Sequence, residues 1–141
     1  MEKLKLQNQM CFKFYAISKH ITGLYKTLLE DLNLTYPQYL TMLVLWEHGS
    51  ISVNDIGKEL LLDSGTLTPL LKRLEQKELL KRIRSSADER RVEIHLTEKG
   101  KNLKQKAVCI PDELIAGITM EGAEILQLNE TLNKMMASIK Q

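Results

Sequence analysis

The sequence predicts a mainly α-helical protein with a small β-hairpin, arranged as a winged helix-turn-helix. Long stretches with helically spaced apolar residues occupy both ends of the chain. Between them, a hydroxyl-rich helical pattern precedes two short strand-like segments that flank a polar, basic turn. Such a unit suits a nucleic-acid duplex, because the helix fits the major groove and the hairpin tip reaches phosphates or the minor groove.

Length and composition limit the class of protein. With 141 residues the chain fits one domain, residues 1–141, that is large enough for a core. No apolar run approaches the roughly 18 residues of a membrane span, and no apolar signal core follows the first residues. Its two cysteines make no disulfide framework. We therefore expect a cytoplasmic protein with no membrane association.

Charge is unevenly distributed along the chain. The net charge is +2, but the segment from Lys72 to Lys106 holds twelve Lys or Arg against six Asp or Glu. A basic zone on a mildly acidic body fits local contact with a polyanion, and it equally fits a solvated charged surface.

Two helices are expected before residue 50. The first runs roughly from Leu4 to Leu32 and stops at Asn33, and Thr35 caps a second, Tyr36–His48, which Gly49 ends. The apolar stripe of the first helix comprises Cys11, Phe14, Ile17, Ile21, Leu24 and Leu28.

A third, short helix, Val53–Leu61, would be capped by Ser52. The fourth begins at Asp63 or Ser64 and ends near Lys77. Its core face is predicted to be Leu67, Leu70, Leu71 and Leu74, opposite Gly65, Pro69, Lys72, Arg73 and Gln76, with Thr66 and Thr68 at the flanks.

Pro69 leaves the start of the fourth helix open. Proline favours the first helical position, so Thr68 could be the cap and Pro69 the first residue. Alternatively, Pro69 lies one turn inside a helix begun at Asp63 and causes a local kink.

The hairpin is expected from Leu79–Arg84 and Val92–Leu96. A fifth helix from Thr97 to about Ala116 is interrupted or bent at Pro111. The last helix, about Glu121 to Lys140, has a narrow apolar seam suited to a partner helix, either the first helix of the same chain or that of a second chain. The seam comprises Ile125, Leu128, Leu132, Met135 and Ile139.

Several segments together resemble a known family. Asp88-Glu89-Arg90, followed by Leu96-Thr97-Glu98-Lys99-Gly100, resembles the wing signature of the MarR family of dimeric bacterial repressors. Residues 8–12, 36–40 and 62–69 resemble the organic hydroperoxide resistance regulators within that family. The resemblance implies a winged-helix core at residues 35–100, with dimerisation helices at 1–34 and 101–141.

The resemblance also implies which residues meet DNA. Arg90 would be the wing arginine that enters the minor groove. Asp88 would orient the wing through a salt bridge, expected to Arg73. Arg84 and Arg91 are either DNA contacts or solvated surface charges. The residues placed on the reading helix are Ser64, Thr66, Thr68, Pro69 and Lys72.

Cys11 is the second chemical feature. A lone cysteine on an apolar helix face is most often a small buried hydrophobe. All four tyrosines, however, lie in the first forty residues, and phenol hydroxyls can hydrogen-bond a thiolate. The resemblance implies that Cys11 is a redox sensor assisted by Tyr15, Tyr25 and Tyr36.

Helix geometry restricts this sensor. Tyr15 is one turn from Cys11, but Tyr25 is fourteen residues on, about 21 Å along a straight helix. A shared site would therefore need Tyr25 from an antiparallel partner. Cys109 is a possible second thiol, although we expect it to be inert and partly buried.

The resulting hypothesis is a homodimeric repressor that binds a pseudo-palindromic operator when reduced. Organic hydroperoxides oxidise Cys11, and the operator is released. Two alternatives stay open, a repressor of the same family released by a small aromatic ligand, and a small thiol peroxidase. The scattered histidines His20, His48 and His95 give no metal signal, and no cofactor is expected.

Overall fold

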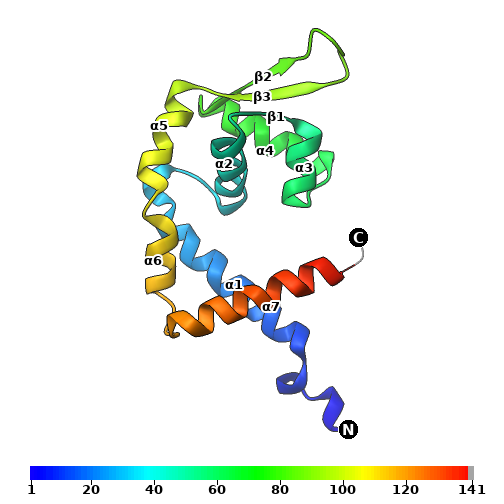
Figure 1. Cartoon of the computed structure of the whole chain (residues 1–141), viewed down its shortest axis with the longest axis vertical. Helices are drawn as coiled ribbons and strands as arrows, with labels where there is room; N and C mark the ends of the chain where they lie inside the picture. Colours follow the sequence, from blue (N-terminus) through cyan, green and yellow to red (C-terminus); the bar gives the residue numbers. More distant parts are fainter. Residues whose placement is uncertain (140–141) are drawn as a thin grey trace.

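The computed structural model describes residues 1–139, in which a mainly helical fold carries a small antiparallel sheet. Figure 1 shows the hairpin at one end of the long axis and the N-terminus near the other. The predicted fold class is confirmed. Lys140, the expected end of the last helix, lies outside the described residues.

The predicted start of the first helix is wrong. Helix α1 spans Met10–Leu28, and residues 2–8 form two 3-10 turns instead of helix. Asn8 donates its side-chain amide to the carbonyl of Glu2 at 2.9 Å, and Gln9, whose backbone is extended, donates to the carbonyl of Lys3 at 2.5 Å. These bonds satisfy carbonyls that an α-helix would use, so they compete with helix formation.

The three helices of the core agree closely with the sequence prediction. They are α2 (Tyr36–His48), α3 (Val53–Leu60) and α4 (Ser64–Gln76). Thr35 and Gln38 form a reciprocal capping box on α2, and the predicted stop at Gly49 has a positive φ of 74°. The predicted core face of α4 is confirmed, since Leu67, Leu70, Leu71 and Leu74 are all buried.

Pro69 lies inside α4, so the second of the two alternatives is correct. The carboxylate of Asp63 caps the helix by accepting from the backbone N–H of Thr66 at 2.8 Å. Pro69 lacks the N–H that would bond the carbonyl of Gly65. The first turn of α4 therefore depends on the Asp63 cap for its order.

The sheet has one strand more than predicted. Strands β2 (Leu80–Arg84) and β3 (Val92–Leu96) form the expected hairpin, with Leu80 opposite Leu96. The short β1 (Ser50–Ser52) pairs with the other edge of β3, which gives the order β1-β3-β2. Three residues beside a glycine are too few to show an alternating pattern, so β1 was missed.

The C-terminal part forms three helices, as the proline predicted. Thr97 caps α5 (Glu98–Ala107), and α6 (Ile110–Ala116) follows after a break just before Pro111. The last helix, α7, spans Gly122–Ser138. Within the described helices Met10–Leu28 and Gly122–Ser138 no residue is buried, although both carry apolar side chains.

Candidate functional site

The exposed side of α4 carries most of the predicted reading residues. Its apolar face packs into the core, which leaves the opposite face free for contact with a partner molecule. Thr68 is half-buried, and the other members of the set are exposed, namely Ser64, Thr66, Pro69, Lys72 and Arg73. Hydroxyls and cations on one exposed helix face can bond base edges and phosphates.

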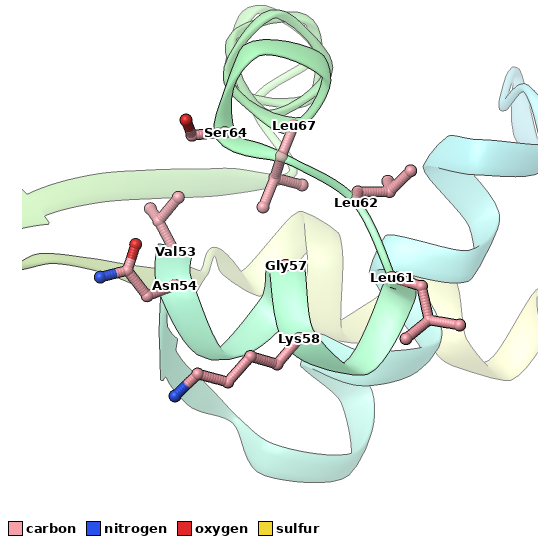
Figure 2. A pocket seen from close by; sticks show the side chains of 8 residues that line it. All are labelled: Val53, Asn54, Gly57, Lys58, Leu61, Leu62, Ser64 and Leu67. Atoms are coloured by element: carbon pink, nitrogen blue, oxygen red, sulfur yellow. The ribbon is translucent and has the colours of Figure 1, made fainter. Parts of the chain in front are cut away.

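A cleft of about 510 Å³ lies between α3 and the start of α4. At one side of the cleft, Gly57 lets the backbone of α3 lie close to the segment that leads to α4. A β-carbon on Gly57 would lie 2.9 Å from the carbonyl oxygen of Leu62. Figure 2 shows the polar ends of Asn54, Lys58 and Ser64 directed to the same side of this cleft. In a helix-turn-helix the first helix crosses the DNA backbone, so Asn54 and Lys58 join the candidate interface. The sequence reading missed both residues, because a single polar side chain on a short helix carries no pattern.

The wing tip is held by its own backbone. The Asp88 carboxylate accepts from the N–H of Arg90 at 3.0 Å, and the Asp88 carbonyl accepts from the N–H of Arg91 at 2.9 Å. Among the ion pairs described for residues 1–139, none joins Asp88 to Arg73, so that prediction is wrong. The carboxylate acts inside the turn, where a bond to a neighbouring N–H costs less side-chain order than a long-range pair.

Arg82 links the wing to the reading helix through hydrogen bonds, a role that the sequence analysis did not predict. Its backbone N–H and its Nε donate to the two carboxylate oxygens of Glu75 on α4, at 3.1 and 2.8 Å. These hydrogen bonds from Arg82 hold the pKa of Glu75 below its usual range. The two elements that would touch DNA are thereby fixed to each other.

Three arginines of the wing line one hollow beside the reading helix. Arg82, Arg90 and Arg91 line a hollow of about 190 Å³ together with Thr68 of α4. The hollow brings the wing arginines beside the reading helix, where positive charge favours an anion such as a phosphate. Lys72 and Arg84 are not among the residues that line it.

The α1 residues of the predicted thiol sensor lie towards opposite ends of that helix. Cys11 and Tyr15 lie at its exposed first turns, where every described residue from 10 to 20 is exposed. Tyr25 lies near the other end and stacks on Tyr36 of α2, with ring centroids 4.3 Å apart. Both Cys11 and Tyr25 belong to one continuous helix, so about 21 Å separates them along its axis. The structure therefore brings Tyr25 and Tyr36 together but leaves Cys11 away from them within the chain.

The tyrosine cluster has a third member, Tyr39, which is almost fully buried. Burial, and then the neighbouring Tyr36 and Tyr39, raise the pKa of Tyr25 to about 12. Burial also raises the pKa of Tyr36. These phenols therefore keep their protons at neutral pH and can donate hydrogen bonds to an anion such as a thiolate.

Cys109 differs from the prediction in one respect. Its thiol is exposed in the single chain rather than partly buried, since it lies at the break between α5 and α6. A hydrogen bond to Glu113 is the largest of the causes that raise its pKa. A raised pKa lowers the thiolate fraction, which agrees with the expected inertness.

The described part of the chain lacks two further kinds of feature. Residues 1–139 contain no cluster of three or more His, Cys, Asp or Glu side chains that could hold a metal ion. Over the same residues, no helix is long and apolar enough to cross a membrane.

Comparisons with known proteins agree with this geometry. Residues 23–107 match the family described as "Transcriptional regulator SarA/Rot". The chain is 49% identical over 140 residues to the organic hydroperoxide resistance transcriptional regulator of Bacillus subtilis (strain 168), and the match covers 99% of this chain and 95% of the relative.

Two solved structures are similar to this chain. Reduced AbfR bound to DNA is 39% identical, with a TM-score of 0.77 and 97% of each chain covered. A mutant MarR from E. coli in complex with operator DNA has a TM-score of 0.80 over 86% of this chain and 89% of the other, and at 24% identity it supports the fold alone. The sequence match over nearly the full length and the shared fold show that the chain belongs to the MarR/SarA family of winged-helix transcriptional regulators, of the organic hydroperoxide resistance type.

Proposed function

We propose that this regulator is a homodimeric repressor that binds a pseudo-palindromic operator when Cys11 is reduced and releases it when an organic hydroperoxide oxidises Cys11. The observation that carries the proposal is the exposed Cys11 on α1, a helix with no buried residue over Met10–Leu28. The 49% identity to an organic hydroperoxide resistance regulator supports the same signal.

DNA recognition would use the two elements fixed to each other by Arg82 and Glu75. Helix α4 would enter the major groove with Ser64 and Thr66 at its exposed start, and Arg90 of the wing would enter the minor groove. AbfR, a similar protein whose structure was determined bound to DNA, supports contact with DNA. Asn54 and Lys58 would contact the phosphate backbone beside the cleft.

Dimerisation would cover the apolar side chains of α1 and α7. Phe12, Phe14 and Ile17 of α1 are between 39% and 55% exposed. The exposed apolar residues of α7 are between 46% and 67% exposed, namely Leu126, Leu128 and Met136. Exposed apolar side chains gathered on two helices in this way favour burial against a second copy. Two reading heads one helical turn of DNA apart, about 34 Å, would then match two half-sites.

The chemistry of the signal needs only Cys11 and the peroxide. The thiolate sulfur attacks one peroxide oxygen, so a new S–O bond forms while the O–O bond breaks. Sulfur is oxidised to a sulfenic acid, and the hydroperoxide is reduced to an alcohol as the leaving alkoxide takes up a proton. A small thiol can then form a mixed disulfide, or more peroxide can oxidise the sulfur further.

The tyrosines that assist this step would come from the partner subunit. Tyr25 and Tyr36 are stacked and protonated at neutral pH. Tyr25 lies about 21 Å along α1 from the thiol of its own chain. An antiparallel second copy would bring its tyrosine pair towards Cys11. Oxidation would then disturb the dimer interface itself and change the spacing of the reading heads.

The test is operator binding by the wild type and by Cys11→Ser, each with and without cumene hydroperoxide. We expect peroxide to release the wild type and to leave Cys11→Ser bound. Cys109→Ser is the matched control and should respond like the wild type. Release of Cys11→Ser by peroxide would refute the proposed sensor, and release of the untreated wild type by a phenolic ligand alone would support the aromatic-ligand alternative.

A further inference from the structure

A chain of aromatic contacts leads from the tyrosine pair towards the wing. Tyr25 of α1 stacks on Tyr36 and also approaches Tyr39 of α2, with a centroid distance of 5.7 Å. Two helical turns further along α2, the rings of Tyr39 and Trp46 lie edge to face, with centroids 6.4 Å apart. Trp46 is the single tryptophan of the sequence. These contacts connect the end of α1 with the far end of α2, which contacts α5.

Trp46 in turn forms a hydrogen bond with the backbone of α5. Its indole N–H donates to the carbonyl oxygen of Gly100 at 2.9 Å, across 54 positions of sequence. Gly100 lies in the first turn of α5, three residues after Thr97, the residue that joins β3 to this helix. The hydrogen bond therefore attaches α2 to the junction between the wing and the helices that lead to α7.

The junction has little freedom to move alone. A β-carbon on Gly100 would lie 2.0 Å from the carbonyl oxygen of Leu79, so the two backbones are in direct contact. Thr97 adds two bonds to the same segment, from its N–H to the Leu79 carbonyl and from its hydroxyl to the Glu78 carbonyl. Leu79 immediately precedes β2, so a displacement of the first turn of α5 must displace the base of the wing.

We propose that Trp46 is the positioning residue that couples the sensor to the wing, through its indole hydrogen bond to Gly100. The inference rests on the proposed peroxide sensing at Cys11. In the reduced protein the tyrosine stack holds Trp46 against Gly100, and the wing stays in its reading position. Oxidation disturbs the stack, the indole leaves the Gly100 carbonyl, and the wing base moves with α5.

The single tryptophan allows a direct test in the wild-type dimer. Nitrogen-15 labelling gives one indole N–H resonance, which can be followed as cumene hydroperoxide oxidises Cys11, with oxidation measured by mass spectrometry and release by operator binding. We expect the resonance to move and its hydrogen exchange to become about three- to tenfold faster, as the loss of one hydrogen bond predicts. An unchanged resonance and exchange rate in fully oxidised, released protein would overturn the coupling.

Trp46→Phe tests the same bond by substitution, because it keeps an aromatic ring but removes the N–H. We expect Cys11 to be oxidised at the wild-type rate, while the ratio of operator Kd values between oxidised and reduced protein falls by about fivefold or more, within the range of site-to-site coupling. A wild-type ratio would contradict the proposal, and if the variant does not fold, the resonance of the wild type decides.

Lys104→Met is the matched control, since Lys104 Nζ bonds the backbone carbonyl of the same tryptophan at 3.2 Å but does not touch the indole link. Lys104→Met should keep the wild-type ratio of operator Kd values between oxidised and reduced protein. If this ratio falls as far as in Trp46→Phe, the indole has no special role. If peroxide leaves wild-type Cys11 reduced, or leaves the oxidised wild type on the operator, the sensing function itself is wrong and the coupling is refuted with it.

Discussion

The winged-helix core and the terminal helices differ in how completely they bury their apolar residues. The buried hydrophobic side chains lie between Leu29 and Ile110, and they include eight from α2 and α4 together with Ile94 of the sheet. In α1 and α7, by contrast, no side chain that the structure describes is buried. A reading head can thus be complete in one chain, whereas the terminal helices have apolar faces that one chain leaves uncovered.

This difference separates the two halves of the proposed mechanism. The elements expected to touch DNA are capped, packed and fixed to each other, so their geometry is already determined in the monomer. Cys11 lies on α1, which has no buried residue in the single chain and would meet a second copy in the proposed dimer. A sensor located in the incomplete region can respond to oxidation through the dimer contact without unfolding the reading head.

The largest effect should follow from a charge in the seam of α7. Leu132→Asp would bury an unpaired carboxylate in the dimer, which costs several kcal/mol, roughly 2–7, so we expect monomers or unfolded chain and no operator binding. Sedimentation velocity measures the outcome. Asn133→Asp, which adds the same charge at a neighbouring exposed position away from the seam, should stay dimeric. A folded wild-type monomer at micromolar concentration would contradict the dimer and the operator arrangement together.

A cavity in the core should have a different consequence. Leu74 of α4 is fully buried, so Leu74→Ala should lower the free energy of unfolding by about 2–5 kcal/mol while the dimer persists. Urea unfolding measures the loss, and sedimentation checks the dimer. A cost below about 1 kcal/mol would mean that the core is less closely packed than the buried α4 face indicates.

The wing arginine should affect DNA binding without affecting stability. Arg90→Ala is expected to weaken operator binding by roughly 1–3 kcal/mol, since it removes a groove contact. Lys72→Ala, the comparison variant on α4, should weaken binding more evenly across DNA sequences and reduce the salt slope by about one. Titrations of operator and unrelated DNA at several salt concentrations separate the two. Wild-type operator affinity in Arg90→Ala would refute the wing assignment.

The smallest effect concerns the tyrosine cluster at high pH. Burial raises the pKa of Tyr25 from 10.0 to about 12, so the folded state holds this proton more tightly than the unfolded state does. The associated stability is fully present below pH 10 and is lost as the pH rises towards 12. Urea midpoints at pH 8 and pH 11 should therefore differ less in Tyr25→Phe than in the wild type. An equal loss in both proteins would exclude this contribution from Tyr25.

The sequence predicted most of the fold because the core elements carry local signals. Capping residues such as Thr35, Ser52 and Thr97 mark their helix starts correctly, and Pro111 marks the division between α5 and α6. The start of α1 was misplaced because side chains of Asn8 and Gln9 compete for backbone carbonyls, an effect with no periodic pattern. The choice between the two positions of Pro69 needed the actual geometry of the Asp63 cap.

The candidate site was less predictable than the fold, because it depends on contacts between distant parts of the chain. The resemblance supplied Cys11 and the wing motif, but the expected pair of Asp88 with Arg73 is absent from the described ion pairs, and Asp88 bonds within its own turn. The bond between Trp46 and Gly100 spans 54 residues, and the bonds of Arg82 to Glu75 join two elements. Neither leaves a sequence pattern.

The most direct test of a sensor completed by the partner subunit is the oxidation rate of Cys11 in mixed dimers. A Cys11→Ser chain is paired with a Tyr25→Phe chain, so that the only sensor thiol faces an intact Tyr25 from its partner, and the rate is compared with that of the Tyr25→Phe homodimer. We predict the wild-type rate in the mixed dimer and slow oxidation in the homodimer. Equal rates in the two dimers would contradict the shared site.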